Sequence, residues 1–499
     1  MPKKFFVTTP IYYMNGYPHL GHYYATTVAD TLARIFRKKQ GAFFLTGTDE
    51  HGEKVAKKAQ EGGYTPKEFT DELAKEWCQT WQNMDIAYDY FIRTTDEHHK
   101  QFAQYIIQTL QERGALYEQE YQALYCVGAE SFVSKSDLRE GGLCPDHDES
   151  PETIDERNWF FKLSDYKATI RDLIHSDRLK ITPQSRKNEV LEMLDNPQVT
   201  DFSVTRERVS WGIPVPFDSN QTIYVWIDAL FNYLSAVVAE QNIAFQGRSI
   251  EDVLADLDMV WPPDVHLLGK DIVKFHAIYW PAFLLALGVP EDSLPRELLV
   301  TGMFLSQGRK MSKSLGNIVL PQDIIDFFNQ ETQTQRGNDI LRYYVLREMR
   351  LGNDGDITQE RVEEVYQSEL VNKVGNTFHR VVGMARKYEL MDARMPEKKA
   401  QKLEESIDKE LNKRLQRYDI YEALAYLQHL CQEIGHGIET AKPWEMKKQG
   451  QISELEMQLG QWMTLLEILA DKFAPYLPES SQVMKDLIKG GDVCLFPRI

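Results

Sequence analysis

Cysteine is scarce in this sequence: five residues in 499, scattered along the chain and odd in number. That usage excludes a disulfide framework and favours a reducing compartment. No apolar run approaches the roughly 18 residues of a membrane span, and no secretory leader precedes the first strand pattern. Internal repeats and low-complexity runs are also missing. We therefore expect a cytoplasmic globular protein.

Basic residues are also fewer than acidic ones, which gives a formal net charge of −18. That total is unusual for a nucleic-acid-binding protein, although recognition depends on where basic residues cluster. The length predicts two to four domains, since single cores stop growing at roughly 250–300 residues. With 42% hydrophobic and 11% aromatic residues, the chain has the material for a large core.

The segment from Thr8 to His22, TTPIYYMNGYPHLGH, predicts a strand end, a turn and the start of a helix. A helix N-terminus reached from a strand suits a polyphosphate, because its backbone N–H groups are unpaired and its dipole is positive. His19 and His22, three residues apart in the first turn, would both point at that anion. The alternative is two helix-start histidines without a role.

A second motif lies almost 300 residues later, from Gly308 to Asn317, GRKMSKSLGN. Arg309, Lys310 and Lys313 stand among glycines and serines, which predicts a mobile basic loop that can fold over phosphates. A given pentapeptide such as KMSKS arises by chance in such a chain with a probability on the order of one in several thousand. The two motifs together resemble the signatures of class I aminoacyl-tRNA synthetases. Their surroundings resemble the methionyl-tRNA synthetase family over essentially the whole chain.

The resemblance implies an α/β fold, with a doubly wound, Rossmann-type parallel-sheet catalytic domain split by an insertion and followed by an all-α helical bundle. It also implies ATP-dependent activation of L-methionine to methionyl-adenylate and transfer to the 3′-terminal adenosine of tRNA(Met). The methionine carboxylate would attack the α-phosphorus in line without a general base. Mg²⁺ and the catalytic residues His19, His22, Lys310 and Lys313 would meet the charge that builds on the phosphates. The resemblance also assigns Met311 and Ser312 of the loop to ATP binding.

Five segments are expected from the change in pattern along the chain. With the roles that the resemblance implies, they are the first half of the nucleotide-binding catalytic domain (1–114), a connective insertion (115–216), the second catalytic half (217–300), the KMSKS loop with a connective, stem-contact region (301–357), and a helical anticodon-binding domain (358–499). Within the fourth segment, the polar stretch Phe328 to Asp339 is expected to be a loop.

A strand-end loop, GTDEHG, spans Gly47 to Gly52. Its three adjacent polar side chains could be taken for a metal cluster, but neighbours in sequence cannot readily converge on one ion. A surface turn is a simpler interpretation. The resemblance implies a third role, in which Asp49 receives the ammonium group of the amino acid.

The segment YVWIDALFNY has apolar residues at helical spacing, which by itself predicts only a core-facing helix. By resemblance it belongs to a methionine pocket. A pocket of this kind suits a flexible, polarisable thioether that packs on aromatic rings. The residues that the resemblance assigns to methionine are Ile11, Tyr13, Asp49, Trp226, Ala229, Leu230, Tyr233, Ile272 and His276.

Another strand-end loop, HLLGKD, spans His266 to Asp271. By resemblance Gly269 lets the backbone approach adenosine and Asp271 accepts the ribose hydroxyls, as carboxylates do in dinucleotide folds. A plain turn is the alternative interpretation.

The insertion carries Cys126 and, further on, Cys144 and His147, where the resemblance implies a zinc knuckle. Ala129 stands where the second cysteine of the knuckle is expected. Three ligands would need Glu130, Asp146 or a water to close a tetrahedral site. We therefore expect a vestigial knuckle held by packing rather than bound zinc, with Cys126, Cys144 and His147 as the ligands should zinc bind.

After about Thr358 helical periodicity continues to about Leu487, which predicts a bundle. Residues 371–399 carry seven Lys or Arg and three acids, an excess that is usually only a solvated face. By resemblance Asn376 and Arg380 read anticodon bases and Trp444 stacks on one, which matches how single-stranded bases are recognised. Because relatives that dimerise often use an extra C-terminal domain, we expect a monomer.

Two rival functions remain open. An HxGH turn on this type of sheet also serves other adenylyltransferases, but nothing in their chemistry requires a helical bundle. A tRNA-binding protein descended from a synthetase would be expected to lose motif residues, whereas both histidines and both lysines are present here.

Overall fold

The structure is a computed structural model that describes residues 3–14, 16–126, 131–133, 138–139, 141–144, 150–207, 209–257, 259–306, 308–310 and 317–499. Its contacts divide the chain into two compact units. The first comprises Met1–Pro18 and Ala33–Thr301, and the second His19–Leu32 and Gly302–Ile499. Helix α1 (Leu20–Gln40) therefore contributes its first part to the second unit and the remainder to the first.

A parallel sheet organises the first unit, and its described strands number seven in the order β2-β3-β1-β13-β14-β8, with β4 beside β3. The strands are β1 (Phe5–Thr8), β2 (Tyr12–Tyr13), β3 (Ala42–Asp49), β4 (Tyr90–Arg93), β8 (Lys180–Thr182), β13 (Val265–Gly269) and β14 (Glu297–Thr301). Strands β1 and β3 are buried along their whole length, as expected for parallel strands covered on both faces.

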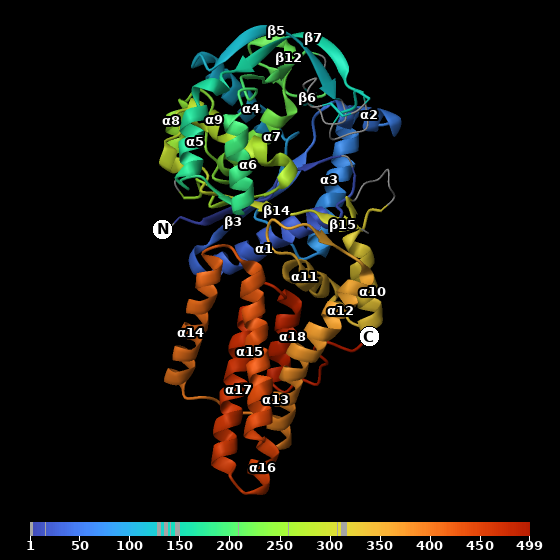
Figure 1. The fold of residues 1–499 in the computed structure, drawn as a ribbon, viewed down its shortest axis with the longest axis vertical. Coiled ribbons are helices and arrows are strands. Elements are labelled where there is room, and N and C mark those ends of the chain that lie inside the picture. Colours follow the sequence, from blue (N-terminus) through green and yellow to red (C-terminus); the bar gives the residue numbers. More distant parts are fainter. Residues whose placement is uncertain are drawn as a thin grey trace. The chain divides into compact units, whose positions relative to one another are not determined.

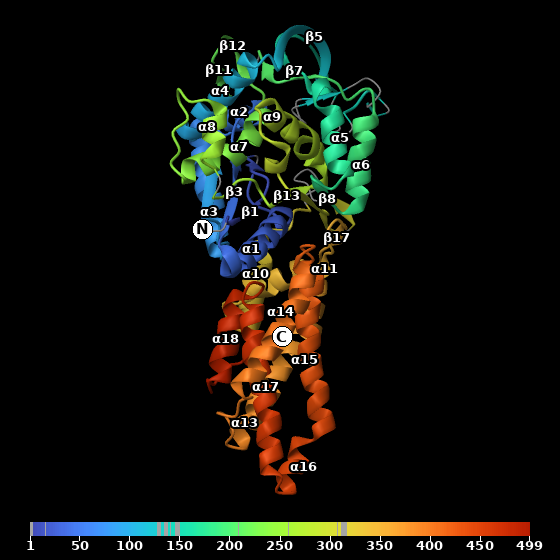
Figure 2. The same cartoon turned by 90° about the vertical axis from the view of Figure 1, so that its left-hand side faces the viewer.

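Helices surround this sheet (Figure 2). They are α2 (Glu53–Glu61), α3 (Pro66–Asn83), α4 (Glu97–Glu112), α5 (Lys167–His175), α6 (Gln184–Asp195), α7 (Val225–Glu240), α8 (Ile250–Ala255) and α9 (Trp280–Ala286). Apolar residues of α4, α5, α7 and α9 join those of the strands in one continuous core cluster. Helix α7 is buried nearly all round rather than on one face, because its sequence is apolar on every side.

Two smaller sheets lie in the first unit (Figure 1). One is built from β5 (Leu116–Cys126), β6 (Ser131–Val133), β7 (Glu152–Phe161) and β9 (Phe202–Ser203), with β5 and β7 as a long antiparallel pair. The other contains β10 (Thr205–Arg206), β11 (Pro214–Val215) and β12 (Asp218–Ile223).

The expected insertion, residues 115–216, is not wholly separate from the catalytic sheet, and that expectation needs correction. Strand β8 falls within this range, yet it pairs in parallel with β14 at the sheet edge. Three β8 residues carry too little pattern to reveal a parallel partner more than 100 residues later, so this pairing was not visible in the sequence.

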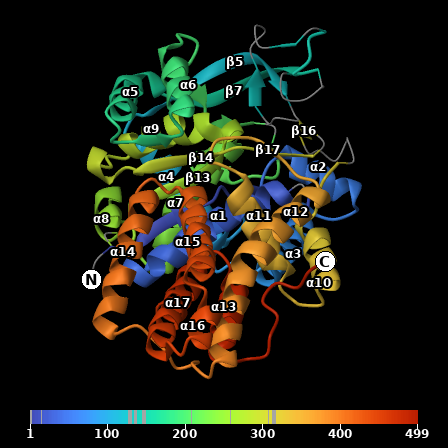
Figure 3. The same ribbon diagram turned by 60° about the horizontal axis from the view of Figure 1, so that its bottom comes forward.

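The second unit contains a small sheet of β15 (Phe304–Ser306), β16 (Arg309–Lys310) and β17 (Gly355–Asp356). Its helices are α10 (Pro321–Thr332), α11 (Gly337–Glu348), α12 (Gln359–Val365), a π-helical stretch Tyr366–Gly375, α13 (Asn376–Lys387), α14 (Glu397–Leu415), α15 (Ile420–Ala441), α16 (Pro443–Lys448), α17 (Ile452–Phe473) and α18 (Pro478–Ile488). Figure 3 shows α13, α15 and α17 packed side by side. The parallel sheet with its helices and the helical C-terminal region confirm the predicted fold class.

The polar stretch from Phe328 to Asp339 was expected to be a loop, and that is wrong at both ends. Helix α10 continues to Thr332, and α11 already begins at Gly337. The two helices approach so closely that a Cβ on Gly337 would lie 2.2 Å from the Ile325 carbonyl oxygen. A glycine is needed there because the two helices pack so closely, and in the sequence this glycine was taken as a sign of a loop.

Among the described residues, no helix combines the length and apolar character that crossing a membrane requires.

Candidate functional site

The order of the parallel strands locates the expected ligand site of the first unit. Strand β1 pairs with β3, which follows it in the chain, and on its other side with β13, more than 250 residues later. Ligands of open parallel sheets bind beyond the carboxyl ends of strands at such a switch point. Asp49 ends β3, and Gly269 ends β13. The predicted loops GTDEHG and HLLGKD therefore emerge at the same edge of the sheet.

The glycine of the second loop makes room for an acidic side chain. A Cβ on Gly269 would lie 2.7 Å from Asp271 Oδ1, so any larger residue would push this carboxylate aside. Asp271 itself is exposed. This geometry suits a backbone that a ligand approaches closely, with a carboxylate beside it.

The residues assigned to methionine are brought together from four separate segments. Tyr13 on β2 stands opposite Asp49 on β3, and the Met14 N–H donates to the Asp49 carbonyl over 3.0 Å. The Tyr233 hydroxyl and His276 Nε2 are 2.7 Å apart. Ile11, Tyr13, Trp226 and Ile272 are partly buried and pack on the core cluster that contains Leu230 and Tyr233; Ala229 is buried beside them in α7.

Aromatic stacking adds a residue that the sequence reasoning missed. The Trp226 and Phe275 rings stack with centroids 3.9 Å apart and planes 9° from parallel. Phe275 begins the short π-helical turn Phe275–Tyr279, which also carries His276. Its position one residue before the assigned histidine was the available signal.

His276 is held uncharged by its surroundings. Burial lowers its pKa to about 4, although the hydrogen bond from its Nδ1 to the Ile272 carbonyl (3.0 Å) favours the charged form. Burial also raises the pKa of Tyr233 well above the usual value, so this hydroxyl keeps its proton. Two neutral, hydrogen-bonded groups thus stand side by side, as an uncharged ligand side chain requires.

The three polar neighbours Asp49, Glu50 and His51 point to different partners. Glu50 accepts two hydrogen bonds from the Arg93 guanidinium, at 2.7 and 2.8 Å. His51 Nδ1 lies 2.7 Å from the Asp228 carboxylate, which His99 Nε2 contacts at the same distance. Asp49 differs from both, because its backbone carbonyl accepts the Met14 N–H at the end of β2.

Asp228 forms the centre of a buried network that the sequence did not reveal. Burial would raise the pKa of this carboxyl, but the two histidine partners outweigh burial and lower it. His99 Nδ1 continues the network to Ser235 Oγ at 2.7 Å. A lone aspartate in the otherwise apolar segment YVWIDALFNY was the signal, because a buried carboxylate needs partners.

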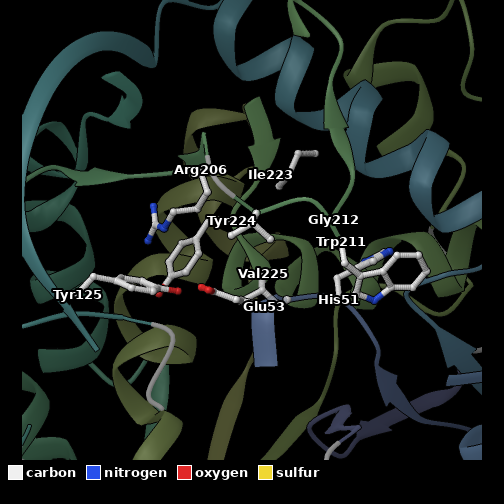
Figure 4. Close-up of a pocket in the computed structure, with 11 residues that line it drawn as sticks. His51, Glu53, Tyr125, Arg206, Trp211, Gly212, Ile223, Tyr224 and Val225 are labelled. Carbon is white, nitrogen blue, oxygen red and sulfur yellow. The ribbon is translucent and has the colours of Figure 1, made fainter. Parts of the chain in front are cut away.

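A cavity lies next to His51, and Figure 4 shows the residues that line it. The Arg206 guanidinium lies 3.7 Å from the centre of the Tyr224 ring, and the Glu53 carboxylate points toward Tyr125. Burial, together with Glu152 and Glu156, raises the pKa of Glu53. The cavity is thus built from aromatic rings, one guanidinium and one acid.

The two motif histidines lie at the start of α1, in the second unit. Their rings stack with centroids 3.8 Å apart. The His19 N–H donates to His22 Nδ1 (3.2 Å), and the Gly21 N–H donates to His19 Nδ1 (3.1 Å). Both Nδ1 atoms are therefore acceptors, so a neutral ring carries its proton on Nε2. Burial, with the adjacent His19, lowers the pKa of His22 well below its usual value.

The flanks of the basic loop lie beside this helix start. The Leu20 N–H donates to the Val319 carbonyl over 3.1 Å, and the Tyr24 ring meets Phe304 of β15 edge-on at 5.3 Å. Lys310 pairs with Leu305 between β16 and β15. Met311, Ser312 and Lys313 lie outside the described residues. The segments before and after the loop therefore both reach α1.

The residues assigned to the anticodon lie on the helical part of the second unit. Asn376 is exposed at the start of α13, and Arg380 follows one turn later, with its Nη2 2.5 Å from Glu439 Oε1 of α15. Trp444 on α16 is 38% exposed, which is unusual for so large an aromatic side chain. A polar helix face and an exposed indole are the two elements that reading unstacked bases requires.

The candidate zinc ligands are only partly described. Cys126 and Cys144 are buried and form no disulfide. His147, Ala129, Glu130 and Asp146 lie outside the described residues. Within the part of the chain that the structure describes, no three His, Cys, Asp or Glu side chains form a metal-binding group. Two cysteines alone do not make a closed tetrahedral site.

Comparison with known proteins defines the class. The family model "tRNA synthetases class I (M)" matches residues 5–149 and 144–382. Together with the parallel sheet and the paired motifs, this match shows that the chain belongs to the class I tRNA synthetases.

Relatives that match nearly the whole of this chain identify one family within the class. A methionine–tRNA ligase of Thermotoga maritima is 36% identical over 495 residues, covering 96% of this chain and 74% of that protein. Another from Synechocystis sp. is 36% identical over 487 residues, covering 96% and 88%. The methionyl-tRNA synthetase of Mycobacterium tuberculosis, solved with methionyl-adenylate, superposes with a TM-score of 0.87 at 29% identity, covering 97% and 94%. The chain is a member of the methionine–tRNA ligase family.

Proposed function

We propose that this chain activates L-methionine with ATP to methionyl-adenylate and transfers the methionyl group to tRNA(Met), using the residues assigned above. The observation that carries the proposal is the joining of the two motifs: the Leu20 N–H at the HLGH turn donates to Val319, just beyond the KMSKS loop. Two motifs with phosphate-binding chemistry are thereby tied together in one unit.

In the first step the methionine carboxylate, already ionised at neutral pH, attacks the α-phosphorus of ATP, and pyrophosphate leaves. No general base is needed, so the protein contributes positioning and charge stabilisation. His19 and His22 are suited to this because Nδ1 of each ring accepts a hydrogen bond, which makes Nε2 the nitrogen that carries a proton. Lys310 and Lys313 add positive charge from the loop, and Mg²⁺ enters bound to the ATP phosphates.

The amino acid is bound by two kinds of contact in this proposal. Asp49, a carboxylate at the end of a buried strand, receives the α-ammonium group. The thioether packs among Ile11, Tyr13, Ala229, Leu230 and the stacked Trp226 and Phe275 rings, and the neutral pair Tyr233 and His276 closes the pocket. Adenosine is held through Gly269 and Asp271.

In the second step the 2′-hydroxyl of the terminal adenosine of tRNA attacks the adenylate carbonyl, and AMP leaves. Selection of the tRNA is assigned to Asn376 and Arg380, which hydrogen-bond base edges, and to Trp444, which stacks on a base. The +4 excess of residues 371–399 supplies local attraction on a chain of net charge −18. We assign this role to residues 358–499, and catalysis to residues 1–114 and 217–300 with strand β8.

Pyrophosphate exchange with each amino acid in turn tests the proposal. Exchange dependent on methionine alone is the expected result. Exchange with another amino acid would reassign the substrate, and no exchange would favour a tRNA-binding protein without catalysis. A cytoplasmic location and a monomeric state stay predictions, which cell fractionation and sedimentation measure directly.

A further inference from the structure

His266 is a buried histidine that the proposed mechanism does not use. It lies on β13, fully buried, directly opposite Thr8 of β1 in the parallel register. These are the two strands that meet at the switch point. Burying a histidine costs free energy unless both ring nitrogens have hydrogen-bond partners.

Both nitrogens of His266 are engaged, and the partners determine its protonation. The Trp280 indole N–H donates to His266 Nε2 over 3.3 Å, and an indole nitrogen can only donate. Nε2 therefore carries no proton. Nδ1 carries it and donates to Thr8 Oγ1 at 2.7 Å. Burial, together with the nearby His276, holds the pKa of His266 well below its usual value, in agreement with a neutral ring.

The same reasoning assigns the protons of the neighbouring pair. The Ile272 carbonyl can only accept, so His276 Nδ1 is the donor and Nε2 the acceptor. The Tyr233 hydroxyl must then donate its proton to His276 Nε2. This proton is committed within the protein, and Tyr233 keeps only lone pairs for any other partner.

The His266 ring connects these two hydrogen-bonded groups. It packs against the Tyr233 ring with centroids 4.3 Å apart, and Trp280 lies 5.8 Å from the same tyrosine. The Thr8 side chain also forms a hydrogen bond with the Tyr233 hydroxyl. This bond lowers the pKa of Tyr233, whereas burial raises it. Tyr233 is therefore held at its ring face by His266 and at its hydroxyl by His276.

We propose that His266, locked between Trp280 and Thr8, is a positioning residue for the methionine pocket, which sets the place of Tyr233 without touching the substrate. The proposal rests on the assignment of Tyr233 and His276 to methionine. It predicts that loosening His266 weakens methionine binding selectively, because neither Thr8 nor His266 is among the residues assigned to ATP.

Thr8→Val is the sharpest test, since it removes the acceptor for His266 Nδ1 and the contact of the same hydroxyl with Tyr233, with almost no change in volume. In methionine-dependent pyrophosphate exchange we expect KM for methionine to rise about tenfold, the factor that one unpaired buried hydrogen-bonding group typically produces. KM for ATP and kcat should stay within about twofold. Thr8→Ser keeps the hydroxyl and should restore KM for methionine.

Thr9→Val is the matched control, because Thr9 is the next residue, is equally buried and bonds to Thr46 instead. It should leave KM for methionine unchanged. If Thr8→Val changes KM for ATP and kcat as much as KM for methionine, or if Thr9→Val has the same effect, the residues serve the fold alone and the proposal is overturned. An unchanged KM for methionine overturns it equally.

Nitrogen NMR of the histidine-labelled full chain supplies a readout independent of activity. His266 and His276 should both show a protonated Nδ1 and an unprotonated Nε2 at neutral pH. An Nε2-protonated ring at either position would refute the proton assignment. If the unaltered chain shows no exchange with methionine, the proposed function fails, and the NMR result still reports whether the locked histidine exists.

Discussion

Replacing Arg342 with methionine should lower the free energy of unfolding of the second unit by about 3–5 kcal/mol, the usual cost of stranding one charge of a buried pair. Both Arg342 and Asp30 are fully buried, with Nη2 and Oδ2 2.7 Å apart. Burial would lower the pKa of the guanidinium, but the Asp30 carboxylate outweighs burial and raises it. Methionine removes the guanidinium from this contact, so the Asp30 side chain stays buried without the ion pair to Arg342.

Two further contacts of Arg342 place the estimate toward the upper part of that range. Its Nε donates to the Tyr476 carbonyl and its Nη2 to the Pro475 carbonyl, each over 3.2 Å. Each lost bond to a charged group typically adds about 1.5–3 kcal/mol when measured alone, although such losses do not sum fully. The guanidinium thus ties the first part of α1 to the segment between α17 and α18.

Denaturant unfolding followed by fluorescence measures the effect, and two variants control it. Arg350→Met breaks an exposed pair with Glu422 and should cost at most about 1 kcal/mol. The double variant Asp30→Leu with Arg342→Met removes both charges and should be more stable than Arg342→Met alone. An Arg342→Met loss no larger than that of Arg350→Met would refute the reasoning, as would a double variant less stable than the single one.

Three other predictions follow from the site. Lys313→Ala should slow methionine activation by about 10²–10³-fold while methionine affinity, measured by equilibrium dialysis, stays unchanged; a parallel loss of affinity would place the loop in the pocket. Because the pKa of His276 is lowered from 6.5 to about 4, the unfolded chain binds this proton first, and stability should fall as the pH drops from about 6.5 to about 4, by roughly 3 kcal/mol. His276→Gln should flatten that dependence in unfolding curves, and an unchanged slope would contradict the assignment. Metal analysis of chelator-free protein should find no stoichiometric zinc, and finding it would show that the knuckle at Cys126 and Cys144 is functional.

The fold class was predictable because each of its signals is local. The aromatic and β-branched run before Thr8, the turn and the HLGH helix start lie within about 20 residues, as strand–turn–helix signals do. The loss of β pattern after Thr358 likewise needs no long-range information. By contrast β8, with three residues, joins the central sheet only through β14, and no local pattern predicts that pairing.

The candidate site residues also divide into those that a local motif identifies and those that only contacts in the folded chain identify. Asp49, Gly269 and His276 stand in motifs, so resemblance could point to them, and their roles stay predictions. Phe275 and Asp228 were missed because their significance depends on what they contact. Trp226 stacks on Phe275, and Asp228 lies between two histidines that are 48 positions apart in the chain. Apolar periodicity treats such positions as ordinary core.

By itself, the sequence determined the class of protein, the order of the HLGH and KMSKS motifs and the change from a parallel sheet to a helical bundle, because these are written in short motifs and periodic patterns. Only the tertiary structure decided which ring nitrogen of each buried histidine carries the proton, and which buried charged side chains form ion pairs. Thr8 and His266 are 258 positions apart, and Asp30 and Arg342 are 312 apart. The energy of such contacts depends on distance and burial in space, and neither quantity exists until the chain has folded.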